Sequence, residues 1–170
     1  YRRGMDAALR IRQRALAGKT ASIDDRIASG LSELLINSPL RDVLGLGKVR
    51  VAYTAGDTIA PDLLAFFRAL GINLKQLYGS TETSFFVAIQ PDGAVKYDTV
   101  GRTGSGVEVK ISPQREILVR SPGLFREYHR DPEATAGAKD AEGWFHTGDA
   151  GYFGEDGQLR IIDRLRHVGA

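Results

Sequence analysis

The sequence predicts an α/β fold, in which part of a parallel-sheet α/β subdomain is followed by a small antiparallel β subdomain. Apolar runs at residues 49–53 and 72–78 enclose a helical stretch that begins at Pro61, which is the pattern of a strand, a crossover helix and a second strand. From residue 98 onward, apolar and charged residues alternate, as in antiparallel hairpins. Glycine makes up 20 of the 170 residues and lies mainly between short apolar runs, which indicates many tight turns.

Two helices are expected before the first strand. The first covers residues 2–16 and is amphipathic and basic; its basic face could be solvated, or could contact anionic lipid or the phosphates of a large substrate. The second covers residues 23–37, where apolar residues recur every three or four positions and Asp24 and Asp25 suit the positive N-terminal end. We expect Pro39 to prevent this helix from continuing.

The first subdomain is expected to span residues 1–97. Its crossover helix runs from Pro61 through Leu70 and ends at Gly71. A right-handed crossover places the ends of both flanking strands at one edge of a parallel sheet, and ligands bind at that edge in α/β folds. A further strand is predicted for residues 85–89.

The second subdomain is expected to span residues 98–164. Alternating apolar residues predict strands in three places, around residues 107–111, 117–119 and 159–161. Residues 155–157 read Glu-Asp-Gly and predict a hairpin turn, because Asp-Gly suits positive φ. Residues 131–136 begin Asp-Pro-Glu, which predicts the start of a short helix.

Composition excludes several classes of protein. The chain has 23 lysines and arginines against 21 acidic residues, so its net charge of +2 is too small to indicate nucleic acid as a partner. It has no cysteine and therefore no disulfide or thiolate metal site. No apolar run approaches the roughly 20 residues that span a bilayer. We expect a cytoplasmic protein and leave peripheral membrane contact open.

Three segments occur in an order that resembles one enzyme superfamily. They are Tyr78-Gly79-Ser80-Thr81-Glu82, His146-Thr147-Gly148-Asp149 and Ile161-Ile162-Asp163-Arg164. In this order they resemble the adenylate-forming, or AMP-binding, superfamily, which includes acyl-CoA synthetases, the adenylation domains of peptide synthetases, and luciferases. Members activate a carboxylic acid with ATP to give an acyl-adenylate. The chain is similar to the later part of the large N-terminal domain of such an enzyme.

The resemblance implies a role for each residue of the first segment. Positioning and charge neutralisation dominate phosphoryl chemistry, and Glu82 offers one hard carboxylate ligand for Mg²⁺. The hydroxyl of Thr81 can donate to a phosphate oxygen, so Thr81 and Glu82 are the expected catalytic residues. Gly79 allows close backbone approach, and Tyr78 supplies a flat face for adenine.

The later segments are expected to hold the ribose. Asp149 resembles the family's ribose-binding aspartate, whose carboxylate accepts hydrogen bonds from both ribose hydroxyls. Arg164 is expected to contact ribose or phosphate. Residues 165–170 are interpreted as the start of a hinge to a missing C-terminal domain. Arg166 occupies a hinge position where the family usually has lysine or aspartate.

Two further positions are expected beside the nucleotide and the acyl group. Gly56 lies in a small-residue loop that resembles the loop packing along adenine in these enzymes. Asp57 follows it, where alanine is common, and could accept from the adenine amino group or cap the next turn. Leu77 replaces a glycine often found before the tyrosine, at a position that borders the acyl pocket in relatives.

The rest of the sequence favours one branch of the superfamily. Residues 31–50, 118–128 and 131–135 look more like long-chain fatty acid–CoA ligases than like peptide-synthetase domains. The resemblance implies an acid–thiol ligase that uses ATP, Mg²⁺ and coenzyme A to convert a long-chain fatty acid into acyl-AMP and then acyl-CoA. Its partners would be these small molecules.

Two other readings stay open. One is a non-catalytic, adenylate-binding scaffold, and the other is an amino-acid-adenylating domain of a peptide synthetase. The family's phosphate loop is expected before Tyr1, and its C-terminal domain with a catalytic lysine is expected after Ala170. We therefore expect a fragment that binds nucleotide poorly and does not catalyse by itself.

Overall fold

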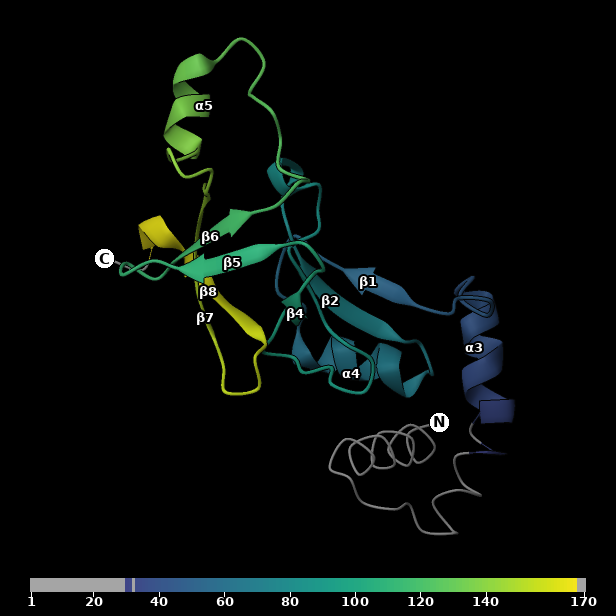
Figure 1. The fold of residues 1–170 in the computed structure, drawn as a ribbon. Coiled ribbons are helices and arrows are strands. Elements are labelled where there is room, and N and C mark those ends of the chain that lie inside the picture. Colours follow the sequence, from purple (N-terminus) through teal and green to yellow (C-terminus); the bar gives the residue numbers. More distant parts are fainter. Residues whose placement is uncertain (1–29, 32, 168–170) are drawn as a thin grey trace. The chain divides into compact units, whose positions relative to one another are not determined.

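The computed structural model describes residues 30–31 and 33–167 (Figure 1). The expected helix at residues 2–16 and the first part of the helix at 23–37 lie outside these residues. The described residues form two compact units. One contains the residues up to Thr54 together with Thr58–Lys75, and the other contains Ala55–Asp57 together with the chain from Gln76 onward.

Pro39 does not end the helix that precedes it, so this expectation was wrong. A π-helical stretch, η1 (Glu33–Asn37), leads directly into the α-helix α3 (Ser38–Val43). Pro39 lies in the first turn of α3. At that position no backbone N–H is needed for an intrahelical bond, so the proline ring is tolerated.

The predicted strand, helix and strand are present. They are β1 (Ala52–Thr54), α4 (Pro61–Ala69) and β2 (Leu74–Tyr78). Pro61 occupies the start of α4, and Gly71 follows the C-terminal end with a φ of +93°, which favours glycine. At the start of the sheet, the Ala52 N–H donates to the Asn73 carbonyl at 3.0 Å.

The strand expected at residues 85–89 is shorter than predicted. The 3₁₀-helix η2 (Thr81–Thr83) precedes it, and then Ser84 and Phe85 have φ values of 52° and 63°. This left-handed backbone is incompatible with a strand, so β3 comprises only Ala88–Ile89. The strand β3 pairs antiparallel with β2 and with β4 (Arg102–Thr103), and the sheet order is β1-β2-β3-β4.

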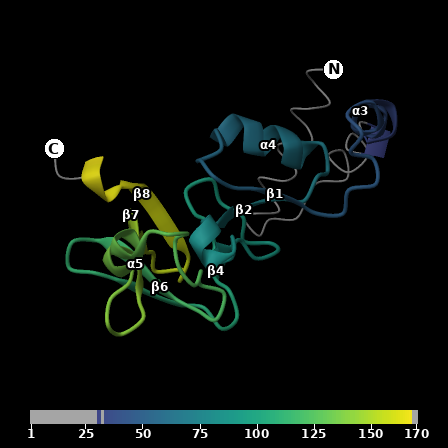
Figure 2. The ribbon, with the colours of Figure 1, turned by 90° about the horizontal axis from the view of Figure 1, so that it is seen from above.

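The second sheet is antiparallel throughout, as predicted. Its strands, in the order β5-β6-β7-β8, are Glu108–Ile111, Glu116–Arg120, Phe145–Phe153 and Leu159–Arg164. The turn between β7 and β8 contains Gly157 with a φ of +69°. The strand β4 and this sheet lie side by side in both views (Figure 1, Figure 2).

Two helical segments complete the second unit. The helix α5 (Pro132–Ala138) begins where Asp131 accepts a hydrogen bond from the Ala134 N–H at 2.9 Å, as the Asp-Pro-Glu sequence predicts. The 3₁₀-helix η3 (Leu165–His167) follows β8. In the part of the chain that the structure describes, no helix is both long and apolar enough to cross a membrane.

The apolar core of the second unit joins β3 to the antiparallel sheet. Its fully buried members are Val87, Ala88, Ile117, Val119 and Leu159. The aromatic ring of Tyr78 packs against this cluster. The end of β2, which carries the first sequence motif, is therefore anchored to the sheet that carries the other two.

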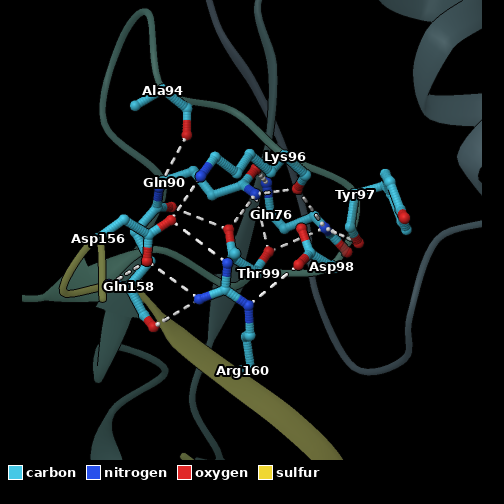
Figure 3. A network of polar contacts seen from close by, with 10 residues as sticks. All are labelled: Gln76, Gln90, Ala94, Lys96, Tyr97, Asp98, Thr99, Asp156, Gln158 and Arg160. Atoms are coloured by element: carbon cyan, nitrogen blue, oxygen red, sulfur yellow. Dashed lines mark hydrogen bonds and ion pairs between the residues drawn. The ribbon is translucent and has the colours of Figure 1, made fainter. Parts of the chain in front are cut away.

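A buried polar network adds a second connection within this unit (Figure 3). Four side chains, each at most 4% exposed, form it: Gln76, Gln90, Thr99 and Gln158. The Gln76 N–H donates to the Gln90 side-chain oxygen at 2.8 Å, and the Thr99 hydroxyl donates to the Gln158 side-chain oxygen at 2.9 Å. Since Gln76 belongs to β2 and Gln158 precedes β8, the network links these two strands.

Candidate functional site

The turn that follows β2 is held in one conformation by its own backbone. A Cβ atom at Gly79 would lie 2.3 Å from the carbonyl carbon of Phe85, so only glycine fits there. The Ser80 N–H donates to the Thr83 hydroxyl oxygen at 2.8 Å, and the Thr83 N–H donates to the Ser80 carbonyl at 3.1 Å. Sparsely populated φ values at Ser84 and Phe85 close the turn.

Glu82 projects from this turn as a partly exposed carboxylate. The Tyr128 hydroxyl donates to its Oε1 at 2.8 Å. The backbone N–H of Glu82 itself, followed by the hydroxyl of Tyr128, lowers the pKa of this carboxyl below its usual value and outweighs the effect of burial. Glu82 is therefore an anion at neutral pH. Its neighbour Thr81 is exposed.

Asp149 lies on β7 and contacts two other predicted site residues. Its Oδ2 accepts a hydrogen bond from the Tyr78 hydroxyl at 2.6 Å, and its Oδ1 lies 3.2 Å from the Arg164 guanidinium. Tyr78 and Asp149 are 71 positions apart in the sequence. The structure thus brings the end of β2, the middle of β7 and the end of β8 to one point.

The neutral form of Tyr78 is favoured at this point. Burial raises the pKa of its phenol far above the usual value, and the hydrogen bond to the Asp149 carboxylate raises it further. Tyr78 is therefore a donor toward Asp149 at every physiological pH. Arg164, whose side chain is 58% exposed, also donates to the Thr147 carbonyl at 3.3 Å.

The backbone around Asp149 is fixed by its neighbours. The Asp149 N–H donates to the Thr147 hydroxyl at 3.1 Å, and that hydroxyl donates to the Ile117 carbonyl at 2.8 Å. Gly148 has a φ of +69° and donates its N–H to Glu116 Oε1 at 3.0 Å. These contacts hold the Asp149 carboxylate toward Tyr78.

An open hollow lies next to this cluster. It has a volume of about 560 Å³ and is lined by Gly148, Arg164, Leu165 and Arg166. Two guanidinium groups therefore border it, which suits an anionic ligand such as a phosphate. Gly148 precedes Asp149 and Arg164 pairs with it, so the hollow adjoins the Asp149 cluster through these two residues.

Three predicted residues, Leu77, Gly56 and Asp57, lie outside the three motifs. Leu77 is half-buried in β2, directly before Tyr78. Gly56 and Asp57 lie in an exposed loop after β1. Gly56 has a φ of +93° and open space beside its Cα atom. Glycine is therefore favoured there by the backbone conformation and not by close packing. Contact of these three residues with a ligand stays a prediction.

Sequence reasoning did not find Tyr128, Thr147 or Glu116. Tyr128 reaches Glu82 across 46 positions, and Glu116 reaches the Gly148 loop across 32. Neither pair has a sequence spacing that signals contact. Thr147 lies inside the His-Thr-Gly-Asp segment, and its bond to the Asp149 N–H is the local turn that such a hydroxyl favours.

The donor set fits one magnesium ion that arrives with a nucleotide. In residues 33–167, no group of three or more His, Cys, Asp or Glu side chains is arranged to hold a metal by itself. Glu82 is anionic and partly exposed, and an ionised carboxylate has about four lone-pair sites, more than Tyr128 uses. Mg²⁺ with phosphate ligands needs only one or two protein carboxylates.

Comparison with known proteins decides the family. Residues 11–129, more than half of the chain, match the family described as AMP-binding enzyme. The chain belongs to the AMP-binding enzyme family. The matched region of this AMP-binding chain includes the Tyr78–Glu82 turn and Tyr128, and it ends before Asp149 and Arg164.

Relatives of the AMP-binding chain include fatty-acid ligases. It is 33% identical over 165 residues to the peroxisomal long chain acyl-CoA synthetase 7 of Arabidopsis thaliana, covering 88% of this chain and 23% of that protein. It is 35% identical over 143 residues to the long-chain-fatty-acid–CoA ligase FadD15 of Mycobacterium tuberculosis (strain ATCC 25618 / H37Rv), covering 84% and 24%. The chain spans about a quarter of the length of these curated relatives.

A solved structure gives the same result for the fold. The amide bond synthetase McbA from Marinactinospora thermotolerans is similar with a TM-score of 0.62 and 36% sequence identity, covering 71% of this chain and 27% of that one. The mixed α/β sheet followed by a curled antiparallel sheet is therefore the arrangement of an AMP-binding enzyme's N-terminal domain.

Proposed function

We propose that the protein containing this chain activates a carboxylic acid with ATP to give acyl-AMP, and then transfers the acyl group to coenzyme A. The acid is a long-chain fatty acid. The protein is thus an acid–thiol ligase, and this chain supplies part of its nucleotide site. Because the chain spans about a quarter of these relatives, the reaction is proposed for the whole protein.

The observation that carries the proposal is the convergence of Tyr78, Asp149 and Arg164. The Tyr78 ring offers an aromatic face for adenine, and the Asp149 carboxylate has lone pairs for the ribose hydroxyls. Arg164, 3.2 Å from Asp149, carries a positive charge at the margin of the hollow. An aromatic face, a carboxylate and a guanidinium in this order match adenine, ribose and phosphate.

Glu82 and Thr81 are proposed to act on the phosphates. The carboxylate of Glu82 would hold Mg²⁺, which neutralises charge on the phosphate oxygens when bound. The exposed hydroxyl of Thr81 would donate to an oxygen of the α-phosphate. Attack by the substrate carboxylate on that phosphorus forms the acyl–phosphate bond and releases pyrophosphate. Glu82 thus contributes a charged group and Thr81 a polar group, and both side chains leave room for the phosphates.

The choice of a fatty acid rests on the relatives, which are named as a long chain acyl-CoA synthetase and a long-chain-fatty-acid–CoA ligase. Leu77, which precedes the adenine-facing Tyr78, is proposed to border the acyl pocket, and a bulkier residue there shortens the space for the chain. Gly56 and Asp57 are proposed to lie along the adenine. Coenzyme A as the acceptor also follows from those names, whereas McbA is named an amide bond synthetase.

ATP–pyrophosphate exchange by the full-length protein tests this function, because exchange reports the adenylation step alone. Long-chain fatty acids, short and aromatic acids, and amino acids are offered separately. We expect exchange with the fatty acids, and formation of the acyl-CoA when coenzyme A is added. Asp149→Asn is the matched loss-of-site control, and Tyr97→Phe, at an exposed tyrosine in the same unit, is the matched neutral control.

Each other outcome points to a different function. Exchange only with amino acids would indicate an amino-acid-adenylating domain. Tight AMP binding without exchange for any acid would indicate a non-catalytic, adenylate-binding scaffold. Exchange with fatty acids but acyl transfer to an amine instead of coenzyme A would indicate an amide-forming enzyme.

A further inference from the structure

Tyr128 contacts the one carboxylate in the Tyr78–Glu82 turn. Its hydroxyl donates to Glu82 Oε1 at 2.8 Å, although the two residues are 46 positions apart. Tyr128 lies in the segment between β6 and α5, which otherwise has no sequence motif of the nucleotide site. A hydrogen bond to a charged acceptor is stronger than one between neutral groups.

This segment holds the turn at two further points. The Phe125 N–H donates to the Glu82 carbonyl at 2.7 Å, and the Ser84 hydroxyl donates to the Gly123 carbonyl at 2.8 Å. We call residues 121–128 the strap, since they bond both the backbone and the side chain of Glu82. Strained φ values at Ser84 and Phe85 persist only where neighbouring contacts hold them, and the strap supplies such contacts.

Tyr128 is itself fixed in place. Its N–H donates to the Thr135 hydroxyl oxygen at 3.0 Å, so the residue is tied to the middle of α5. Its ring lies 4.6 Å from the ring of Phe125, which packs edge-on against Phe145 at 5.6 Å. The Lys139 ammonium donates to the Phe125 carbonyl and lies 4.2 Å from the Phe125 ring.

We propose that Tyr128 is a positioning residue, which holds the Glu82 carboxylate in the rotamer that binds the Mg²⁺ of the nucleotide. It acts through Glu82 and does not itself touch the metal or the phosphates. The inference rests on the proposed function for the role of Glu82. A free glutamate has three rotatable bonds, and fixing them before the metal arrives removes an ordering cost from each binding event.

The test is the magnesium dependence of pyrophosphate exchange in the full-length protein carrying Tyr128→Phe. This substitution removes one hydroxyl and keeps the ring stack. We expect the Mg²⁺ concentration for half-maximal rate to rise roughly tenfold, the size expected for loss of one hydrogen bond to a charged group. The rate should recover at saturating Mg²⁺. Tyr97→Phe makes the same chemical change at an exposed tyrosine and should leave the magnesium dependence unchanged.

A second arm separates positioning from general damage to the fold. Once Glu82→Gln has removed the anionic ligand, adding Tyr128→Phe should cause no further change in magnesium dependence. A uniform loss of rate at all Mg²⁺ concentrations, or equal effects in the two backgrounds, would overturn the proposal.

The ratio of ATP dissociation constants with Mg²⁺ and with EDTA gives a readout independent of catalysis. The wild type could bind ATP more tightly with Mg²⁺ and yet catalyse no ATP–pyrophosphate exchange with any acid. The proposed function then fails, while the role of Tyr128 stays testable. In that case Tyr128→Phe should raise the dissociation constant with Mg²⁺ roughly tenfold relative to the one with EDTA, and an unchanged ratio would refute the inference.

Discussion

At the scale of single residues, Asp149 has both carboxylate oxygens engaged by the protein. Tyr78 donates to one oxygen at 2.6 Å and Arg164 pairs with the other at 3.2 Å. A carboxylate has further lone pairs, so ribose hydroxyls can be added without expelling either partner. The contacts with Tyr78 and Arg164 fix the orientation of the carboxylate, so its remaining lone pairs are preorganised for the ribose hydroxyls.

Asp149→Asn should weaken AMP binding by about 10- to 100-fold, because hydrogen bonds to an ionised acceptor contribute roughly 1.5–3 kcal/mol. The measurement is calorimetric titration of the full-length protein with AMP and with 2′,3′-dideoxy-AMP. The analogue lacks the ribose hydroxyls, so wild type and variant should bind it alike. An equal loss of affinity for both ligands would show that Asp149 acts on the fold and not on the ribose.

At the scale of elements, the polar network of Figure 3 joins β2 to the β7–β8 hairpin. The Gln158 side chain accepts from the Thr99 hydroxyl at 2.9 Å and donates to the Ala94 carbonyl at 3.2 Å. The four side chains at its centre, those of Gln76, Gln90, Thr99 and Gln158, are buried, and buried polar groups are costly when a partner is removed. The network therefore helps to align the strand that carries Tyr78 with the hairpin that carries Asp149.

Gln158→Leu should lower the free energy of unfolding by ~2 kcal/mol, since it leaves the Thr99 hydroxyl and the Ala94 carbonyl without these partners. Urea unfolding monitored by circular dichroism measures the change. Gln114→Leu, at an exposed glutamine in the β5–β6 turn, is the matched control and should have little effect. Equal stability of the two variants would contradict a structural role for the network.

At the scale of the whole molecule, the net charge of +2 hides strong local pairing. The Asp156 carboxylate accepts from Arg160 at 3.0 Å and from Lys96 at 2.6 Å. Arg160 first, and then Lys96, hold the pKa of Asp156 well below its usual value. Stability of the chain should therefore depend on pH in the acid range.

The direction of this dependence follows from the lowered pKa. Asp156 stays ionised in the folded protein at a pH where it is protonated in the unfolded chain. Its stabilising effect is thus present above its ordinary pKa of 3.8 and is lost as the pH falls through the lower folded value. Urea unfolding from pH 5 downward should show a shallower loss of stability for Asp156→Asn than for wild type. Glu155→Gln, in the same turn, should follow the wild-type curve.

The sequence by itself determined the fold class, the family and the approximate places of many helices and strands, but it did not predict β4 or β7. Local signals in the sequence include the apolar runs of the strand–helix–strand segment, turn residues such as Gly71 and Gly157, and the Asp131 helix cap. Each depends on the conformation of a few adjacent residues. The motif order was also readable along the chain.

Only the tertiary structure decided how the motifs meet and what supports them. Tyr78 reaches Asp149 across 71 positions and Tyr128 reaches Glu82 across 46, and no sequence period encodes such distances. Phe85 was expected in a strand but adopts a left-handed backbone, and its carbonyl group lies where a Cβ at position 79 would be. Pairing between distant segments depends on packing of the whole unit, so the local propensity of a segment does not predict it.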